Sequence, residues 1–111
     1  MSLVTKKCTP CSGGVPPLEK DEIEVLMKEL SPRWRLTHGA KRLLRKESFD
    51  DFLKPMEFAN EIGKMAEEQW HHPELHVGHG HLDIEVWTHK INGLVESDFI
   101  FASKVDRILE G

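Results

Sequence analysis

Six of the seven histidines in this 111-residue chain lie between residues 67 and 98, and histidine is the side chain best suited to acid–base chemistry near neutral pH. His71 and His72 stand directly before Pro73, which cannot continue a helix, so the pair is expected at the C-terminal end of a helix. Glu67 lies four residues before His71, a spacing that brings two side chains together on one helical face. This carboxylate and the negative end of the helix dipole both favour the protonated ring, so His71 is predicted to act as an acid.

A further histidine, His89, is expected to approach the same site from a strand. The segment before it alternates between apolar and other side chains, with Leu82, Ile84 and Val86 set against Asp83, Glu85 and Trp87. This period of two is typical of a half-buried strand, so His89 is predicted at the strand's end. Trp34, Trp70 and Trp87 could stack on a flat ligand, although tryptophans of a small domain are more often core or interface residues. Trp87 is the least certain of the three, because on a strand it would share a face with His89.

The remaining histidines raise the alternative of a metal site. Clustered imidazoles bind zinc, copper or nickel, and His76, His79 and His81 are closely spaced. Two glycines are interleaved with them and their spacing fixes no ligand geometry, so the sequence favours adventitious metal binding over a resident ion. His38 lies in a predicted turn and is interpreted as a surface residue.

The elements that must position these side chains follow from two periodicities. Apolar residues at helical spacing predict helices over about 18–31, 51–72 and 96–109, and Asp98 falls in the first turn of the last one. The middle helix is predicted to carry one apolar side: Phe58, Ile62, Met65, Ala66 and Trp70. Strands are predicted over 34–37, 41–49, 74–79 and 81–89, and glycines between the last two favour a hairpin.

This order, α-β-β-α-β-β-α, predicts an α+β fold with a four-stranded antiparallel sheet and three helices packed on one face. Residues 17–111 are predicted to form a single domain. Residues 1–16 are interpreted as a flexible N-terminal tail with little to bury, because proline and glycine punctuate them. A small sheet leaves two edge strands, which invite pairing with a second copy, so a homodimer or homotetramer is expected.

Composition narrows the class of protein. The chain has 39% hydrophobic and 31% charged residues, and no apolar run approaches the ~20 residues of a membrane span. A formal net charge of −4 argues against direct binding to nucleic-acid phosphates. The N-terminal sequence lacks the apolar stretch of a secretory signal, so the cytoplasm is the expected compartment.

The two cysteines, Cys8 and Cys11, form a single C-x2-C pair. A structural zinc site takes four ligands, and no partner set is visible nearby. A reduced thiol pair in the tail is therefore the preferred interpretation.

The motif around the histidines resembles that of the pterin-4a-carbinolamine dehydratases, known in animals also as dimerisation cofactors of a homeodomain transcription factor. The matching residues are Glu67-x3-His71-His72-Pro73, Thr88-His89, Gly93-Leu94 and Asp98, with further likeness at 14–18, 32–36, 49–52 and 102–106. The resemblance covers the chain from about Cys8. Two positions depart from the family pattern, since His79 stands where an aromatic residue is common and Val95 where many relatives have a helix-capping threonine.

The resemblance implies an enzyme that dehydrates 4a-hydroxytetrahydropterin to a quinonoid dihydropterin in the recycling of tetrahydrobiopterin, with no metal or other cofactor. Such an elimination needs an acid and a base that titrate near pH 7, which suits histidine. On this interpretation His71 and His89 are the acid and base candidates. His72 and Trp87 would contact the pterin. Glu67 and Asp98 would set tautomer and charge, and Asp98 could also cap the last helix.

Two other classes of function remain open from the sequence. The first is a binding module, either a non-catalytic dimerisation or coactivator protein, or a pterin-binding protein of molybdenum-cofactor metabolism; the intact histidine set favours the enzyme. The second is a metal-binding protein, which metal analysis of untagged protein would distinguish.

Overall fold

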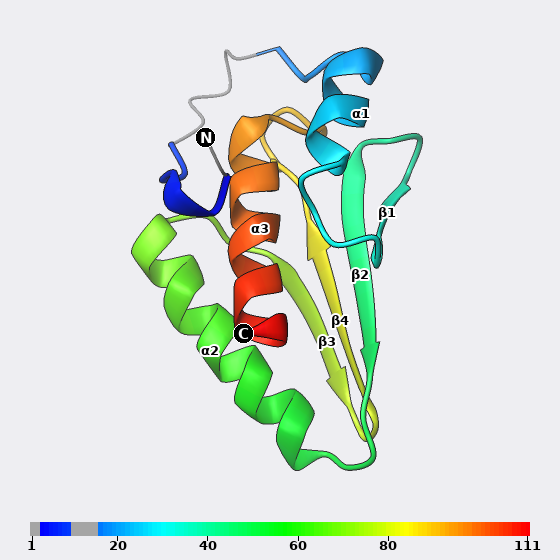
Figure 1. Cartoon of the computed structure of the whole chain (residues 1–111), viewed down its shortest axis with the longest axis vertical. Coiled ribbons are helices and arrows are strands. Elements are labelled where there is room, and N and C mark those ends of the chain that lie inside the picture. The colour runs from blue at the N-terminus through cyan, green and yellow to red at the C-terminus, as the bar shows by residue number, and fades with distance from the viewer. Residues whose placement is uncertain (1–2, 10–15) are drawn as a thin grey trace.

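A computed structural model describes residues 3–9 and 16–111 of the protein. A short 3-10 helix comes first, and three α-helices and four strands follow in the predicted order (Figure 1). Their bounds are η1 Leu3–Thr5, α1 Lys20–Met27, β1 Trp34–Thr37, β2 Arg42–Ser48, α2 Leu53–Gln69, β3 Glu74–Gly78, β4 His81–Val86 and α3 Glu96–Glu110. The α-β-β-α-β-β-α prediction is confirmed.

The strands form one antiparallel sheet in the order β1-β2-β4-β3, so β1 and β3 are the edges. Leu43 of β2 pairs with Val86 of β4, and Leu75 of β3 pairs with Ile84 of β4. This register places the apolar side chains of the three strands on one face of the sheet. The β3–β4 hairpin turns through Gly80 at φ +86°, a value that glycine adopts without strain. The predicted strand 81–89 is shorter than expected, because pairing with β2 and β3 ends by Val86 and only an isolated bridge, Thr88 to Gly93, follows.

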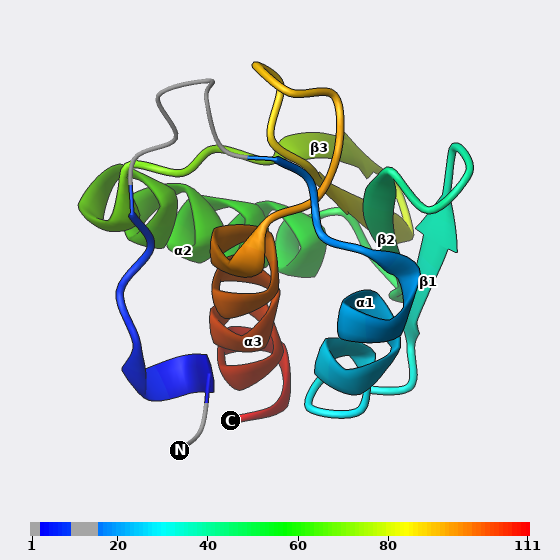
Figure 2. The ribbon, with the colours of Figure 1, turned by 90° about the horizontal axis from the view of Figure 1, so that it is seen from above.

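All three α-helices lie on one side of the sheet, as the view from above shows (Figure 2). The core between the layers is formed by side chains from every layer, all at most 2% exposed: Leu43, Ile62, Ala66, Leu82, Ile84, Val86, Phe99, Phe101, Ala102 and Val105. Because helical and strand periodicities both place these residues inward, burial of this apolar area is the main force that fixes α2 and α3 on the sheet.

The end of α2 departs from the prediction. The helix stops at Gln69, and Trp70 takes left-handed backbone angles, φ 52° and ψ 44°. The amides of Trp70 and His71 both donate to the Ala66 carbonyl and end the helix. Glycine is the usual residue at such a left-handed helix end. The prediction that Trp70 continues the apolar side of the helix is wrong. Trp70 lies after the last helical residue, and it is 69% exposed.

Residues 3–9, here called the N-terminal strap, bury more than the sequence suggested. Leu3 is only 3% exposed and belongs to the core, and the Lys104 ammonium on α3 donates to the Val4 carbonyl at 2.7 Å. The Cys8 amide donates to Gln69 Oε1 at 3.0 Å, and the Thr9 amide donates to Ser97 Oγ at 2.9 Å. In Figure 2 the blue strap runs beside α3 to the end of α2. The expectation of little burial therefore fails for residues 3–9, whereas residues 1–2 and 10–15 lie outside the described residues and the tail-and-domain division stays a prediction.

One charged side chain, Arg45 of β2, is buried on the helical side of the sheet at 2% exposure. Its guanidinium bonds Glu47 at 2.8 Å, Glu110 at 2.8 Å and Asp106, and Asp106 also accepts the Trp34 indole N–H at 2.6 Å. Burial raises the pKa of the Asp106 carboxyl, while these donors act in the opposite direction. The inward arginine explains why the alternation in 41–49 is poor, and its partners tie β1 and β2 to the C-terminal half of α3.

Across the described residues, no helix is long and apolar enough to cross a membrane.

Candidate active site

The C-terminal end of α2, the end of β4 and the start of α3 lie toward the same end of the molecule (Figure 1). A cavity of ≈ 280 Å³ opens there. Its walls are Trp70, His71, His72, Trp87, Thr88, His89 and Lys90. The structure thus brings together four of the six predicted site residues around one cavity, and the other two, Glu67 and Asp98, contact members of that wall.

The most deeply placed pair is His71 with Asp98. His71 Nε2 lies 2.7 Å from Asp98 Oδ1, with Asp98 fully buried and the His71 side chain 11% exposed. The second oxygen, Oδ2, accepts the Thr88 hydroxyl at 2.8 Å and the Val95 amide at 2.9 Å. Asp98 therefore caps α3, whose N-cap residue, Val95, has no side chain that can accept a hydrogen bond, and it fixes the His71 ring at the same time.

This arrangement defines the chemistry open to His71. An ionised carboxylate only accepts hydrogen bonds, so Nε2 of His71 carries a hydrogen and Nδ1 is left to take up or give up a proton. The carboxylate, 2.7 Å from Nε2, fixes the orientation of the His71 ring, so the other ring nitrogen can serve a proton transfer. The same logic of a carboxylate orienting a histidine recurs in unrelated acid–base sites.

Glu67 is placed differently from the prediction. Its carboxylate lies 2.6 Å from His72 Nε2, so it pairs with His72 and not with His71. The prediction assumed that the helix continues to His71, but the left-handed turn at Trp70 ends the 3.6-residue spacing and directs His71 toward Asp98. Both partners are exposed, 70% for Glu67 and 48% for His72, so this pair orients the His72 ring and adds little to stability.

His89 approaches from the other side of the cavity. Its ring stacks on Trp87 with centroids 4.2 Å apart and an interplanar angle of 25°. The Arg42 guanidinium covers Trp87, 3.8 Å from the ring centroid, and bonds Glu85 at 3.4 Å. Trp87 and His89 therefore lie on the same side, as predicted, and the stack fixes the position of the imidazole.

Two residues of this site, Arg42 and Lys90, were given no role from the sequence, and Thr88 entered only as part of the motif. Thr88 is detectable in principle, because a hydroxyl next to His89 is a natural partner for a carboxylate. Arg42 lies more than forty residues away in the sequence, and only the β2–β4 pairing brings it to Trp87. Trp70 was one of three candidate stacking residues, for which a core or interface position was the preferred interpretation.

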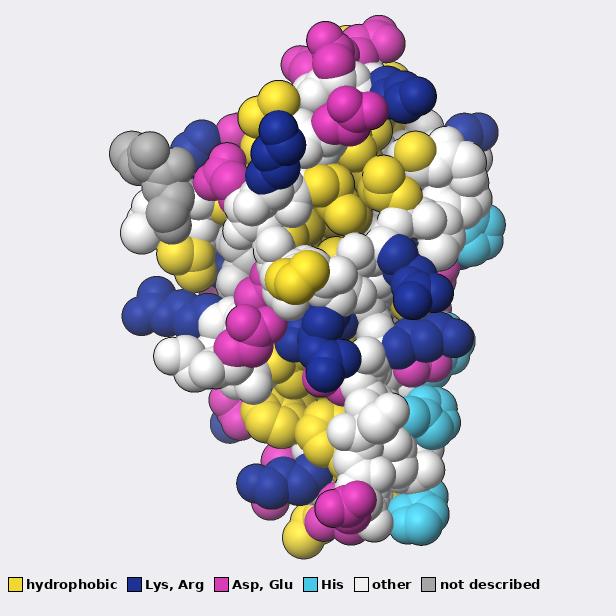
Figure 3. Space-filling model, turned by 45° about the vertical axis from the view of Figure 1, so that its right-hand side comes forward, with side chains coloured by type: hydrophobic (Ala, Val, Ile, Leu, Met, Phe, Trp, Pro, Cys, Tyr) yellow, Lys and Arg dark blue, Asp and Glu magenta, His cyan; other side chains and the backbone are white. Residues whose placement is uncertain are grey.

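The other histidines lie elsewhere. His76 and His81 belong to β3 and β4, and His81 Nδ1 is 3.7 Å from Asp83 Oδ1. Histidine side chains visible in Figure 3 are spread along one margin of the molecule, not gathered in a cluster. Within residues 3–9 and 16–111, no group of three His, Cys, Asp or Glu side chains is placed to hold a metal ion.

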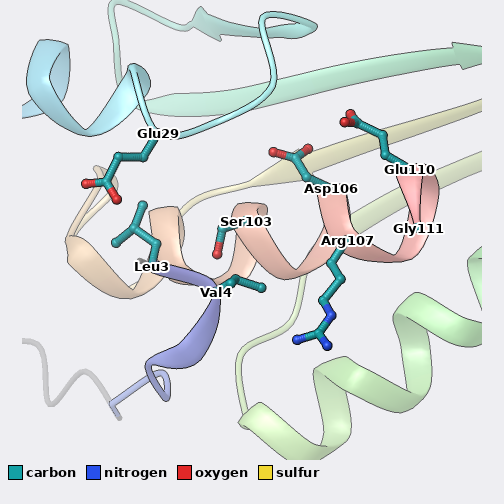
Figure 4. A pocket seen from close by; sticks show the side chains of 8 residues that line it. All are labelled: Leu3, Val4, Glu29, Ser103, Asp106, Arg107, Glu110 and Gly111. Atoms are coloured by element: carbon teal, nitrogen blue, oxygen red, sulfur yellow. The ribbon is translucent and has the colours of Figure 1, made fainter. Parts of the chain in front are cut away.

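A second cavity, of ≈ 360 Å³, lies between η1, the turn after α1 and the C-terminal half of α3 (Figure 4). Its lining is Leu3, Val4, Glu29, Ser103, Asp106, Arg107, Glu110 and Gly111. It contains neither a histidine nor an aromatic ring, and the Asp106 carboxylate is already engaged by Arg45 and Trp34. The cavity between His71 and His89 is therefore the candidate for acid–base chemistry.

Cys8 is half-buried beside this site, with its thiol 3.5 Å from the Ser97 carbonyl, while Cys11 lies outside the described residues. Burial raises the pKa of the Cys8 thiol to about 11, so the thiolate needed for metal binding or redox exchange is scarce near neutral pH.

We expect the double change Cys8→Ser with Cys11→Ser to leave activity and melting temperature nearly unchanged, because a serine hydroxyl can replace the Cys8 donor. Activity assays, thermal unfolding and zinc analysis of both proteins check this. Loss of folding, or loss of stoichiometric zinc with the mutations, would contradict it.

The fold and site together define a small α+β domain with two adjacent histidines, of which His71 bonds a buried carboxylate. A family model described as pterin 4 alpha carbinolamine dehydratase matches residues 16–108, and the chain belongs to this family. A Rickettsia bellii protein provisionally named pterin-4-alpha-carbinolamine dehydratase is 52% identical over 105 residues, covering 95% of this chain and 92% of its own. A Methylococcus capsulatus protein with the same provisional name is 46% identical over 107 residues, covering 96% and 93%.

Solved structures agree with the fold. The crystal structure of a transcriptional coactivator/pterin dehydratase from Brucella melitensis superposes with a TM-score of 0.76 at 28% identity, covering 83% of this chain and 97% of that one. A pterin dehydratase-like protein described as a RuBisCO assembly factor in the alpha-carboxysome gives a TM-score of 0.58 at 21% identity, covering 68% and 87%. The latter likeness concerns the fold alone.

Proposed function

We propose that the protein catalyses the dehydration of 4a-hydroxytetrahydropterin to a quinonoid dihydropterin and water, in the recycling of tetrahydrobiopterin. The observation that supports this most directly is the placement of His71, after α2, and His89, after β4, around one cavity, with His71 bonded to the buried Asp98. Membership of the pterin 4 alpha carbinolamine dehydratase family supports the same substrate class.

The reaction is an elimination in which the C–O bond to the 4a-hydroxyl breaks and a ring N–H loses its proton. Hydroxide is a poor leaving group and must be protonated as the bond breaks, which is the task of the imidazolium of His71. His89 accepts the ring proton, because its ring lines the cavity from the segment after β4 and, among the described residues, pairs with no carboxylate. Each well-placed proton transfer contributes about 10²–10⁴-fold to the rate.

The remaining wall residues position the pterin. His72, oriented by Glu67, offers a ring nitrogen to a polar edge of the substrate, and the indole of Trp87 offers an apolar surface beside His89. Both protons are handled by side chains of this chain, so the proposal requires no metal.

We expect purified protein, prepared without a histidine tag and with metals removed, to accelerate the dehydration of synthetic 4a-hydroxytetrahydropterin above the buffer rate. The decrease in substrate absorbance in a stopped-flow instrument measures this. A rate equal to that in buffer, with the protein folded by circular dichroism, would refute the proposed activity.

A second candidate function is a non-catalytic dimerisation or coactivator module. The similar Brucella melitensis structure is described as a transcriptional coactivator as well as a pterin dehydratase. The apolar side chains of Phe52, Leu53 and Met56 are exposed near the start of α2, where a protein partner would cover them. Loss of dehydration with retention of a protein partner would favour this candidate.

We expect a homodimer or homotetramer in solution, because β1 and β3 leave two open sheet edges and the start of α2 exposes apolar side chains. Multi-angle light scattering at micromolar concentration measures the assembled mass. A single species of 12.8 kDa would show that the protein is a monomer.

A further inference from the structure

Trp70 combines two features that cost stability. Its side chain is 69% exposed, although an indole gains stability from burial. Its backbone lies in the left-handed region at φ 52°, where residues with a Cβ are strained and where glycine or asparagine is normal at a helix end. Strain of this kind, when it persists, is concentrated at functional sites.

The strained turn places the indole at the cavity of the proposed active site. Trp70 lines that cavity together with Trp87, so one indole comes from the end of α2 and the other from the end of β4. The Trp70 ring also stands edge-on to His72, with centroids 5.2 Å apart and an interplanar angle of 80°. Glu67 holds the same His72 ring from its Nε2 atom.

The two indoles differ in what already covers them. The Trp87 ring contacts two neighbours: it is stacked on His89 and covered by the Arg42 guanidinium. Trp70 has only the edge contact with His72 among the ring contacts of the described residues, and most of its surface is open. Trp70 therefore presents the more open of the two aromatic surfaces at this cavity.

We propose that Trp70 is a substrate-positioning residue that covers the flat ring of the bound heterocycle and sets affinity, not the rate of proton transfer. The inference rests on the proposed function for the identity of the substrate. The left-handed turn at Trp70 has two effects on the site. It directs His71 to Asp98, and it leaves the indole in the cavity wall.

The test compares Trp70→Gly, Trp70→Phe and Val25→Ala, the last being a change of an exposed apolar residue on α1 outside the cavity. Glycine relieves the left-handed strain, so Trp70→Gly is expected to unfold at the same temperature as the parent protein or a higher one. In the same variant KM is expected to rise about tenfold, with kcat changed less than threefold, because a stacking contact is lost and the acid and base remain. Trp70→Phe should recover most of the affinity, and Val25→Ala should leave KM unchanged.

A binding measurement keeps this result separate from the proposed activity. Isothermal titration of the parent protein and Trp70→Gly with 7,8-dihydropterin, a stable flat pterin, is expected to show a Kd about tenfold weaker in the variant. Equal Kd values, or no pterin binding by the parent protein, would overturn the role of Trp70. A parent protein that binds the pterin without dehydrating the 4a-hydroxy substrate would refute the proposed activity while leaving the role of Trp70 intact. A lower unfolding temperature in Trp70→Gly with unchanged KM would make Trp70 a structural residue only.

Discussion

Replacing either His71 or His89 with alanine is expected to lower kcat by one or more orders of magnitude. His71 is bonded to a buried carboxylate on α3, and His89 is stacked on Trp87 beyond the end of β4, so the two rings reach the cavity from separate elements. One can serve the leaving hydroxyl and the other the departing proton, and each transfer contributes about 10²–10⁴-fold. Steady-state kinetics with circular dichroism on each variant measure the effect.

The double variant and two further histidines make this prediction specific. His71→Ala combined with His89→Ala should cost much less than the product of the single losses, because groups that act as a unit are not additive. His72→Ala should raise KM more than it lowers kcat. His76→Ala, on β3, is the matched control and should change neither. Full kcat in His89→Ala together with its loss in His72→Ala would show that the roles of these two histidines are reversed.

Replacing Arg45 with alanine is expected to lower the free energy of unfolding by about 3–5 kcal/mol. The guanidinium is 2% exposed and bonds Asp106, Glu47 and Glu110. Its removal leaves Asp106 and Glu110 without their cation, while Glu47 keeps Arg33, and it opens a void between the sheet and α3. A domain of this size is stable by only about 5–15 kcal/mol, so the variant should unfold at much lower denaturant concentration.

Lys46→Ala is the matched control, since Lys46 is an exposed cation on the same strand and its loss should change stability by less than about 0.5 kcal/mol. Urea unfolding of the three proteins gives the comparison. Equal stability of Arg45→Ala and Lys46→Ala would mean that the buried ion network contributes nothing net.

The sequence predicted the order of elements and the sheet because the periodicities in α2, β4 and α3 are strong and consistent with their burial. It failed where one residue overrides the pattern. Trp70 is an unusual residue for a left-handed helix end, so nothing in the sequence indicated that the helix stops before His71 or that Glu67 pairs with His72. Arg45 likewise interrupts the apolar alternation of β2, because its charge is neutralised by α3 residues some sixty positions away.

The candidate site was predictable where its residues lie in one stretch of the sequence. A motif within residues 67–98 identified His71, His72 and His89, and the structure places all three around one cavity. Partners that come from distant positions, such as Arg42 against Trp87, depend on strand register. The burial of Leu3 depends on contacts with α3 from the opposite end of the chain, which no local pattern can indicate.

The N-terminal strap has a consequence for how the chain acquires its structure during synthesis. Lys6 pairs with Glu96, Thr9 bonds Ser97, and the Val4 carbonyl accepts from Lys104, so residues 4–9 contact residues that are translated much later. Contacts of such high sequence separation form late, because the loop between them must close before they stabilise anything. While the ribosome is still adding α3, Leu3 has no core to enter and stays exposed. The nascent chain can therefore complete its core only after α3 has emerged, and a pause before that point would prolong the interval in which the unpaired sheet edges are open to aggregation.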